Sequence, residues 1–568
     1  MTDQNSITPG DAPFESTTAV DALPRRRGTW FPGPRYWIIW AVCVLAIAFV
    51  RNLEVDLAGI NIATLVLTGI AVGLLLFWWV FQSAFPAAIR WLPPTILTVA
   101  VSVFLVRYRP YKTSGGLSLQ FVPRGELVGD QLLDATPGTD SGIIVDLATT
   151  TANDFPCFLG PDMNSVVKTI RIIPDWDDNP PRELWRSEIG AGWCAFSCVN
   201  GFAVTMEQRG DSELVTCRDV ETGKLCWTHA IETRHETVLG FVGPRATPTI
   251  FNGRVYAMGA TGFLRCLNGA DGAEIWVRDL FGEYGISPDD GGGVIWGRAA
   301  SPLIVDDKLF IPVGGNGSGQ RTTLVAMNVD TGETIWEAGK HVASYASPML
   351  MTLHGERQIV SMNEDILTGH DLETGEELWD HPWPGKSNAN ANVSQPNAVG
   401  NDRILISKGY GGGGQLLQIE KSGDDWFADV VWESKRVLKT KFSNVAIRDG
   451  LAFALDQGVL CCADVETGDR LWRRGKYAYG QVLLVDDIIV VMAESGELVL
   501  VRATGDAHEE LCSFNAIEGQ TWNNVCLYGN RILVRNSEEA ACFEIRTEAA
   551  NSTATVSEEA PTSEAATE

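Results

Sequence analysis

The sequence predicts an all-β protein, an eight-bladed β-propeller preceded by an α-helical transmembrane anchor. Three observations predict this class: a short turn-and-strand phrase recurs along the chain, the inner strands give an independent count, and three apolar runs lie before residue 107. The clearest copy of the phrase is Cys-Ala-Asp-Val-Glu-Thr-Gly-Asp-Arg-Leu-Trp at residues 462–472. Its copies end at spacings of 39 to 60 residues, and such self-similarity is typical of solenoids and propellers.

Each part of the phrase has a structural reason. Asp464 can accept hydrogen bonds from the backbone amides of a tight turn, and Gly468 supplies the residue with positive φ that closes it. Trp472 follows on the outer strand, on the same face as Gly468, where its indole can wedge between one sheet and the next. The outer strands of the repeated unit end at Trp185, Trp227, Trp276, Trp336, Trp379, Trp432, Trp472 and, in a degenerate last copy, Leu511.

The inner strands give a second count of eight. They open at Ala195, Thr247, Ser301, Ser347, Gln395, Ser443, Gln481 and Asn523. Four strands per unit and eight units predict an eight-bladed propeller; a β-solenoid is the alternative, but its rungs are usually shorter. The strand ending at Trp185 has no earlier strands of its own, whereas residues 531–546 supply inner strands without a Trp ending. We therefore expect the two ends of the chain to share one sheet and close the ring.

Three apolar runs, at residues 36–50, 59–81 and 91–106, predict transmembrane helices. Buried core helices would be the alternative use of such runs. Five arginines on one side of the spans (Arg25, Arg26, Arg27, Arg35, Arg90) outnumber four basic residues on the other (Arg51, Arg107, Arg109, Lys112), which favours a cytoplasmic N-terminus. Three spans then put the propeller on the periplasmic side of a bacterial inner membrane.

Composition sets the remaining limits. The net charge of −27 disfavours nucleic-acid binding. The twelve cysteines include no Cys-x-x-Cys pair, so no metal site is predicted. We expect a disordered tail at residues 1–29, three transmembrane helices at 30–110 and a juxtamembrane linker with one helix at 111–153. The propeller is expected at residues 154–546 and a disordered acidic tail at 547–568.

The repeat resembles a known family. The pattern Ala/Cys-x-Asp-x-x-Thr-Gly-x-x-x-Trp resembles the tryptophan-docking repeat of PQQ-type (quinoprotein alcohol dehydrogenase-like) eight-bladed propellers, over roughly residues 154–546. The segments Asp-Phe-Pro-Cys-Phe-Leu-Gly-Pro (154–161) and Gly-Pro-Arg-Ala-Thr-Pro (243–248) are similar to bacterial PQQ-binding-like repeat proteins, many of them membrane-anchored. The propeller lipoprotein of the Bam complex shares the repeat. The repeat is specific for a fold and nearly silent about chemistry.

The resemblance implies what an enzyme of this family would need: a quinone in the channel, a Ca²⁺ ion on hard oxygens and an Asp base, often with an adjacent Cys–Cys disulfide. Cys461 and Cys462 are adjacent, but they lie inside a predicted strand, which favours ordinary packing. The polar residues Asp289, Asp290 and Asn316 cannot be matched to metal ligands. Enzyme activity is therefore not expected, and no catalytic residue, metal ligand or resident cofactor is assigned.

The residues just before each innermost strand surround one mouth of a propeller channel. Aromatic and cationic side chains are frequent there, which indicates a ligand or partner pocket; packing between blades is the alternative. Three cations would favour an anionic ligand. These positions hold Trp193, Arg245, Arg298, Tyr345, Asn392, Lys441, Tyr479 and Trp522.

The sequence thus predicts an integral membrane protein whose extracytoplasmic propeller is a binding or assembly scaffold at the cell envelope. The first alternative is an oxidoreductase that uses PQQ with Ca²⁺. The second is a sensor of a small anion. The expected partners are the membrane and either a protein or a small anionic ligand at the channel, with no nucleic acid.

Overall fold

The structure is a computed structural model, and it describes residues 28–53, 57–139, 142–237, 239–287, 295–315, 322–385, 387 and 390–549. Nearly all of the two predicted tails therefore lies outside the described residues. The chain forms two compact units, one made of Met1–Glu54 with Ile60–Arg107 and the other of Val55–Gly59 with Tyr108–Glu568.

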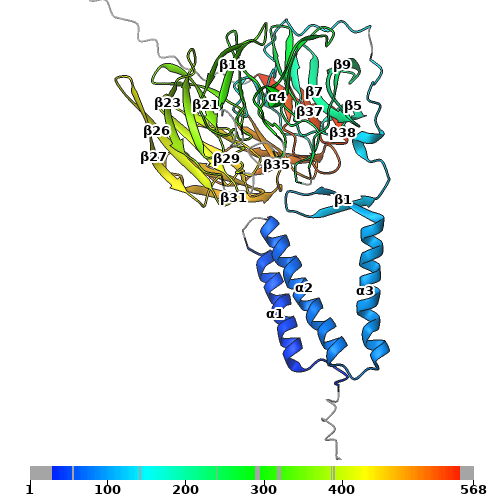
Figure 1. Ribbon diagram of the computed structural model, residues 1–568. Helices are drawn as coiled ribbons and strands as arrows, with labels where there is room; N and C mark the ends of the chain where they lie inside the picture. The colour runs from blue at the N-terminus through cyan, green and yellow to red at the C-terminus, as the bar shows by residue number, and fades with distance from the viewer. Residues whose placement is uncertain are drawn as a thin grey trace, which may run out of the picture. The chain divides into compact units, whose positions relative to one another are not determined.

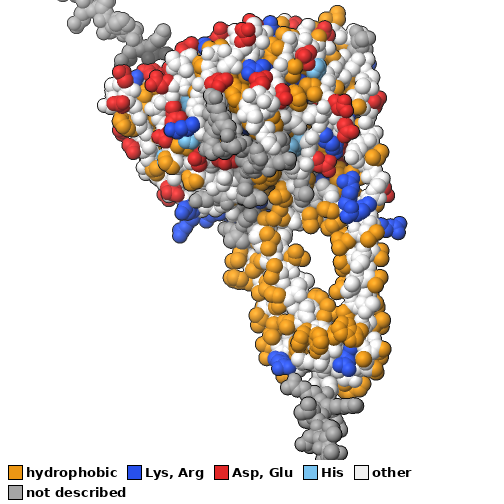
Figure 2. Space-filling model, in the orientation of Figure 1, with side chains coloured by type: hydrophobic (Ala, Val, Ile, Leu, Met, Phe, Trp, Pro, Cys, Tyr) orange, Lys and Arg blue, Asp and Glu red, His pale blue; other side chains and the backbone are white. Residues whose placement is uncertain are grey.

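The first unit is helical. Its helices α1 (Pro34–Arg51), α2 (Leu57–Phe81) and α3 (Ala87–Arg107) are each long and apolar enough to cross a membrane (Figure 1). Few of their side chains are buried, and apolar atoms cover their surface in Figure 2. In a membrane, lipid would cover these apolar side chains, which the unit itself leaves exposed. The helices agree with the three predicted runs and extend each by a few residues.

The second unit is an eight-bladed β-propeller, as predicted (Figure 1). Each blade has four antiparallel strands, numbered from the innermost strand outward, and the sheet of blade seven has a fifth strand, β3 (Val166–Val167), paired in parallel with its innermost strand. Blades one to four comprise β6 (Ser197–Val199), β7 (Phe202–Arg209), β8 (Ser212–Asp219) and β9 (Leu225–Glu232); β12 (Thr249–Phe251), β13 (Arg254–Met258), β14 (Phe263–Asn268) and β15 (Glu274–Asp279); β16 (Leu303–Val305), β17 (Lys308–Pro312), β18 (Leu324–Asn328) and β19 (Thr334–Ala338); β20 (Met349–Leu353), β21 (Glu356–Met362), β22 (Ile366–Asp371) and β23 (Glu377–Pro382).

The last four blades follow the same plan, and the chain ends share the eighth. Blades five to eight comprise β24 (Asn397–Val399), β25 (Arg403–Lys408), β26 (Gly413–Ser422) and β27 (Asp425–Ser434); β28 (Val445–Arg448), β29 (Leu451–Asp456), β30 (Val459–Asp464) and β31 (Arg470–Lys476); β32 (Gln481–Val485), β33 (Ile488–Met492), β34 (Glu497–Arg502) and β35 (Glu510–Asn515); β36 (Cys526–Tyr528), β37 (Arg531–Arg535), β38 (Glu539–Glu544) and β5 (Arg182–Glu188). The early strand β5 pairs with β38, so the ring closes as predicted.

In six blades the docking tryptophan faces a small residue on the third strand of its own blade. These outer strands were predicted to end at the tryptophan, but they continue for two to five residues beyond it. Trp472 is paired with Cys462, and Trp185 with Cys542. The same register recurs in the pairs Trp227–Cys217, Trp276–Cys266, Trp336–Ala326 and Trp379–Gly369. The cysteines of these strands are buried thiols without a disulfide. A thiol is thus used here as a small apolar group beneath an indole.

The remaining elements are short and surround the ring. The segment after α3 forms an antiparallel hairpin, β1 (Tyr108–Thr113) with β2 (Leu119–Pro123), and then the 3₁₀ helix η1 (Gly129–Leu132). The predicted linker therefore contains a β-hairpin that the sequence did not indicate. The other short elements are β3 (Val166–Val167), β4 (Ile170–Ile172), β10 (Glu236–Thr237), β11 (Phe241–Val242), α4 (Leu280–Glu283) and β39 (Thr547–Ala549).

Candidate functional site

A series of polar side chains ties consecutive blades together at the channel. Thr247 Oγ1 accepts a hydrogen bond from the Ala195 amide of the preceding blade, 3.0 Å away. The same bond recurs, at 2.8–2.9 Å, from Thr247 to Ser301, Ser301 to Ser347, Ser347 to Gln395 and Gln395 to Asn444. Asn523 of blade eight donates to the Cys194 carbonyl of blade one, at 2.7 Å. The residues just upstream, at the mouth, are therefore held by a rigid inner ring.

One half of this mouth is filled by aromatic rings. The rings of Trp193 and Trp522 are 4.8 Å apart, and Phe442 lies 4.7 Å from Trp522. Phe241 and Tyr479 complete the cluster, at 5.5 Å from Trp522 and from Phe442 respectively. Three of these five residues were predicted at the mouth. Phe442 directly follows the predicted Lys441 and could have been added, whereas Phe241 lies outside the repeat and carried no such signal.

The tip of the β1–β2 hairpin covers the same half. The Gly115 amide donates to Glu494 Oε1 at 2.8 Å, and Lys441 Nζ donates to the Gly115 carbonyl at 3.1 Å. Gln520 donates to the Thr113 carbonyl at 2.9 Å. The ring of Tyr479 leaves no space for a side chain at residue 115. Lys441 and Tyr479 thus hold the protein's own chain.

Asn392 has a structural environment. Its side chain is 1% exposed, and its amide nitrogen donates to the carbonyls of Asn363, Glu364 and Trp383 at 2.7–3.1 Å. These bonds join the ends of β21 and β23 to the loop before β24. Asn392 therefore has a packing role between blades, which was the alternative to ligand binding for the positions at the mouth.

The other half of the mouth is cationic. Arg298 is 3% exposed, and its Nε and Nη1 atoms have no hydrogen-bond partner among the described residues. Arg245, one blade earlier, donates to the carbonyls of Gly240 and Gly243. Burial lowers the pKa of each guanidinium to about 10, so both remain charged at neutral pH.

Tyr345 lies beside these two arginines. Its ring stacks on Trp296 at 5.3 Å, and its hydroxyl accepts a bond from the Trp296 amide at 3.4 Å. Burial raises its pKa to about 12, against the opposing effect of the two guanidiniums. The phenol is therefore neutral and keeps its proton for donation. Neither Trp296 nor its neighbour Gly297 was predicted, because they stand further from the inner strand than the counted positions.

The opposite ends of the innermost strands are covered by a closing segment, residues 154–167. Phe155 exchanges two backbone hydrogen bonds of 2.8 Å with Cys198 of blade one, and the Pro156 carbonyl accepts from Ile250 of blade two at 2.8 Å. Its end forms β3, which pairs in parallel with β32 of blade seven. Cys157 packs with the inner strands of blades three and four. The segment therefore spans the ring at this end.

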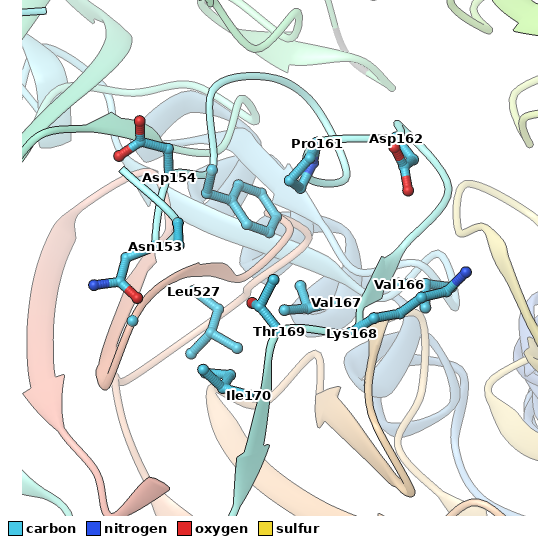
Figure 3. A pocket seen from close by; sticks show the side chains of 13 residues that line it. Asn153, Asp154, Pro161, Asp162, Val166, Val167, Lys168, Thr169, Ile170 and Leu527 are labelled. Atoms are coloured by element: carbon cyan, nitrogen blue, oxygen red, sulfur yellow. The ribbon is translucent and has the colours of Figure 1, made fainter. Parts of the chain in front are cut away.

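A small cavity borders the closing segment. Figure 3 shows Asp154, Lys168 and, from blade eight, Leu527 among the side chains that line it. Its volume is about 130 Å³, below the ~300 Å³ at which typical ligand pockets begin. The space suits water or a small ion better than a cofactor.

The adjacent cysteines are packing residues. Cys461 belongs to the core between blades five and six, and Cys462 to the core between blades six and seven. Burial raises the pKa of each thiol to about 12. Their side chains enter two different blade interfaces, which confirms the strand-packing interpretation.

No cluster of three His, Cys, Asp or Glu suited to a metal occurs among the described residues. Asp289, Asp290 and Asn316 lie outside them. A quinoprotein dehydrogenase would hold Ca²⁺ on oxygen ligands, and in the part of the chain that the structure describes Asp and Glu form no group of three suited to a metal.

The fold and the docking tryptophans define an eight-bladed β-propeller whose repeat is similar to the PQQ-like one. Residues 211–474 match the sequence profile of the family described as outer membrane protein assembly factor BamB. The comparison with curated protein sequences finds no match.

Solved structures align with most of this chain. BamB from Moraxella catarrhalis aligns over 64% of this chain and 100% of its own, with 13% identity and a TM-score of 0.44. The quinohemoprotein alcohol dehydrogenase ADHIIG from Pseudomonas putida HK5 aligns over 76% of this chain and 85% of its own, with 11% identity and a TM-score of 0.50. At such identities the likeness concerns the fold alone.

Proposed function

We propose that this protein is a membrane-anchored binding and assembly scaffold at the cell envelope, with its propeller outside the cytoplasm. The occupation of the two channel ends by the chain itself is the observation that carries the proposal. The hairpin tip and the aromatic cluster occupy half of one mouth, and the closing segment spans the other end. A quinone in the aromatic half of the mouth would have to displace these residues.

The outer strand of blade five offers a surface for a protein partner. β26 and β27 have ten residues each, whereas the other outer strands of the described blades have five to eight. Phe427, Val430 and Val431 on β27 are 51%, 46% and 50% exposed. The free edge of β27 ends its sheet, and an exposed apolar edge is a template for another strand.

This surface is braced and acidic. Trp426 is buried in the core of blades three to five, so the extended hairpin is held against the ring. Exposed Asp425, Asp429 and Glu433 lie among the apolar residues of β27. A partner strand that combines apolar residues with Lys or Arg would complement it.

The experiment uses the full chain in its native membrane. A photo-crosslinking amino acid at Phe427 should give one adduct of defined mass with an identifiable protein, and Val431→Asp should abolish it. The matched control is Ile335, an exposed residue (44%) on the outer strand of blade three. Equal adducts at both positions, or none at Phe427, would contradict the β27 surface.

A titration separates the scaffold from the enzyme. The detergent-solubilised chain is mixed with PQQ and Ca²⁺ and followed by absorbance and calorimetry. We expect no stoichiometric binding. Tight binding with dye reduction by an alcohol would replace the scaffold by a PQQ-dependent oxidoreductase.

A further inference from the structure

We propose that Arg298, Arg245 and Tyr345 form a binding site for a small carboxylate or phosphate in the cationic half of the mouth. The site uses blades two to four and does not depend on a partner at β27. The two proposals therefore fail or succeed separately.

The first observation is the unpaired charge of Arg298. A buried guanidinium without an anionic or hydrogen-bonded partner is strongly unfavourable, because its charge has lost its hydration and gained nothing in return. Other fully buried arginines of this propeller are paired: Arg265 with Glu213, and Arg535 with Thr205 and three carbonyls. Among the residues that the structure describes, neither Arg298 nor Arg245 has a carboxylate oxygen within ion-pair distance.

The second observation is the way the cluster is assembled. Gly297, with φ of +82°, brings the backbone so close that a Cβ there would lie 3.1 Å from Arg245 Nη1 and 3.0 Å from His235 Nε2. The preceding amide, of Trp296, bonds the Tyr345 hydroxyl. One short segment thus gathers the two guanidiniums and the phenol from consecutive blades.

The third observation concerns what the donors can bind. The Arg298 guanidinium lies over the Phe281 ring, 5.3 Å from its centre, so its face is covered and its N–H groups are left for an acceptor. The Tyr345 hydroxyl adds a neutral donor. The Nε2 atom of His235 has no hydrogen-bond partner in the part of the chain that the structure describes. Burial and the nearby Arg245 lower the pKa of this imidazole to about 3, which keeps it neutral.

An oxyanion answers these requirements. A carboxylate or phosphate supplies the missing counter-charge and accepts several charge-assisted hydrogen bonds at once. Because Arg298 is only 3% exposed, the group that reaches it must be small. The structure therefore points to a small-molecule anion.

The test measures the melting temperature of the full chain in detergent with sodium phosphate, succinate or citrate, against sodium chloride at equal ionic strength. We expect a saturable rise with at least one probe. Phosphate and the two carboxylates are separate arms and identify the class of anion. Arg298→Gln should lower the affinity for that anion by about tenfold or more.

Two further measurements distinguish a role of these residues in anion binding from a role in stabilising the fold. Arg298→Gln removes an unpaired buried charge, so the ligand-free melting temperature should not fall. Tyr345→Phe should keep the fold and lower the affinity for the anion. Arg357→Gln, at an exposed arginine paired with Asp306, should bind the anion like the parent protein. The inference is overturned if no probe binds at millimolar concentration. It is also overturned if Arg298→Gln keeps the full response.

Discussion

The indole of Trp432, at the end of blade five, lies against Gly468 in the turn of blade six. Its Nε1 donates to the Val465 carbonyl of that turn at 2.9 Å, and a Cβ on Gly468 would lie 2.6 Å from the ring. The turn glycine therefore has two roles, a φ of +72° and room for the neighbouring tryptophan. The same contact joins Trp185 with Gly223, Trp227 with Gly272, Trp276 with Gly332 and Trp336 with Gly375.

Replacing Gly468 by alanine should separate these two roles. The added methyl group meets positive φ, which costs about 1–2 kcal/mol, and overpacks Trp432, which costs about 1–3 kcal/mol more. Gly423→Ala is the matched control, since Gly423 has φ of +65° and open space around it. Urea unfolding of the full chain in detergent should show the larger loss for Gly468→Ala. Equal losses would mean that the tryptophan contact contributes nothing.

The inner ring of hydrogen bonds should respond to the loss of a single hydroxyl. Thr247→Val keeps the shape of the side chain but leaves the buried Ala195 amide without an acceptor, at a cost of about 1–3 kcal/mol. Thr352→Val is the control, because Thr352 is exposed on the innermost strand of blade four. The free energy of unfolding measures both. A Thr247→Val protein as stable as the control variant would show that the ring bond is dispensable.

Local signals in the sequence explain why the blades could be predicted. The turn glycine and the outer tryptophan lie within a few residues of each other, so their spacing identifies each blade without knowledge of long-range contacts. Trp379 departs from the rule: its indole donates to Gln358 of its own blade. The extended β26–β27 hairpin carries the turn glycine of blade five, Gly423, away from the Trp379 ring, which accounts for the degenerate repeat there.

The mouth was harder to predict because its contacts join distant segments. The eight counted positions follow from the repeat, but their use does not: Asn392 braces a loop, whereas Arg298 lacks a partner. Gly115 meets Glu494 across 379 residues of sequence, and nothing in the local pattern of a Gly-rich linker indicates that contact. Burial and pairing of individual side chains decide such a site, and periodicity contains no information about them.

The closure of the ring should depend on pH through Glu207. Burial alone would raise the pKa of this carboxyl, but Arg209, Arg218 and Arg535 of blades one and eight lower it below its ordinary value. A lowered pKa in the folded state gives stability that is present above the unfolded pKa and is lost as pH falls. We expect the free energy of unfolding to decline below about pH 5.

Glu207→Gln should remove that pH dependence. It should also lower the free energy of unfolding by about 3–5 kcal/mol at neutral pH, because it leaves three buried guanidiniums without their carboxylate. Urea unfolding between pH 4 and pH 8 measures both effects. Glu183→Gln, at an exposed carboxylate paired with Arg186, is the control and should retain the parent profile. An unchanged slope in the Glu207→Gln protein would assign the acid sensitivity to other groups.

The contact between the hairpin tip and the aromatic half of the mouth should open when residue 115 gains a side chain. Gly115→Val would force the tip away from Tyr479 and break the bonds of residue 115 to Glu494 and Lys441. Overpacking costs about 1–3 kcal/mol, so local opening of the hairpin should become about tenfold more frequent or more. Hydrogen exchange of peptides covering residues 108–123, read by mass spectrometry, should quicken while the core strands of blades seven and eight stay protected. Gly138→Val provides the control, because this linker glycine has open space around it. Unchanged exchange in the Gly115→Val protein would show that the tip does not depend on the mouth for its order.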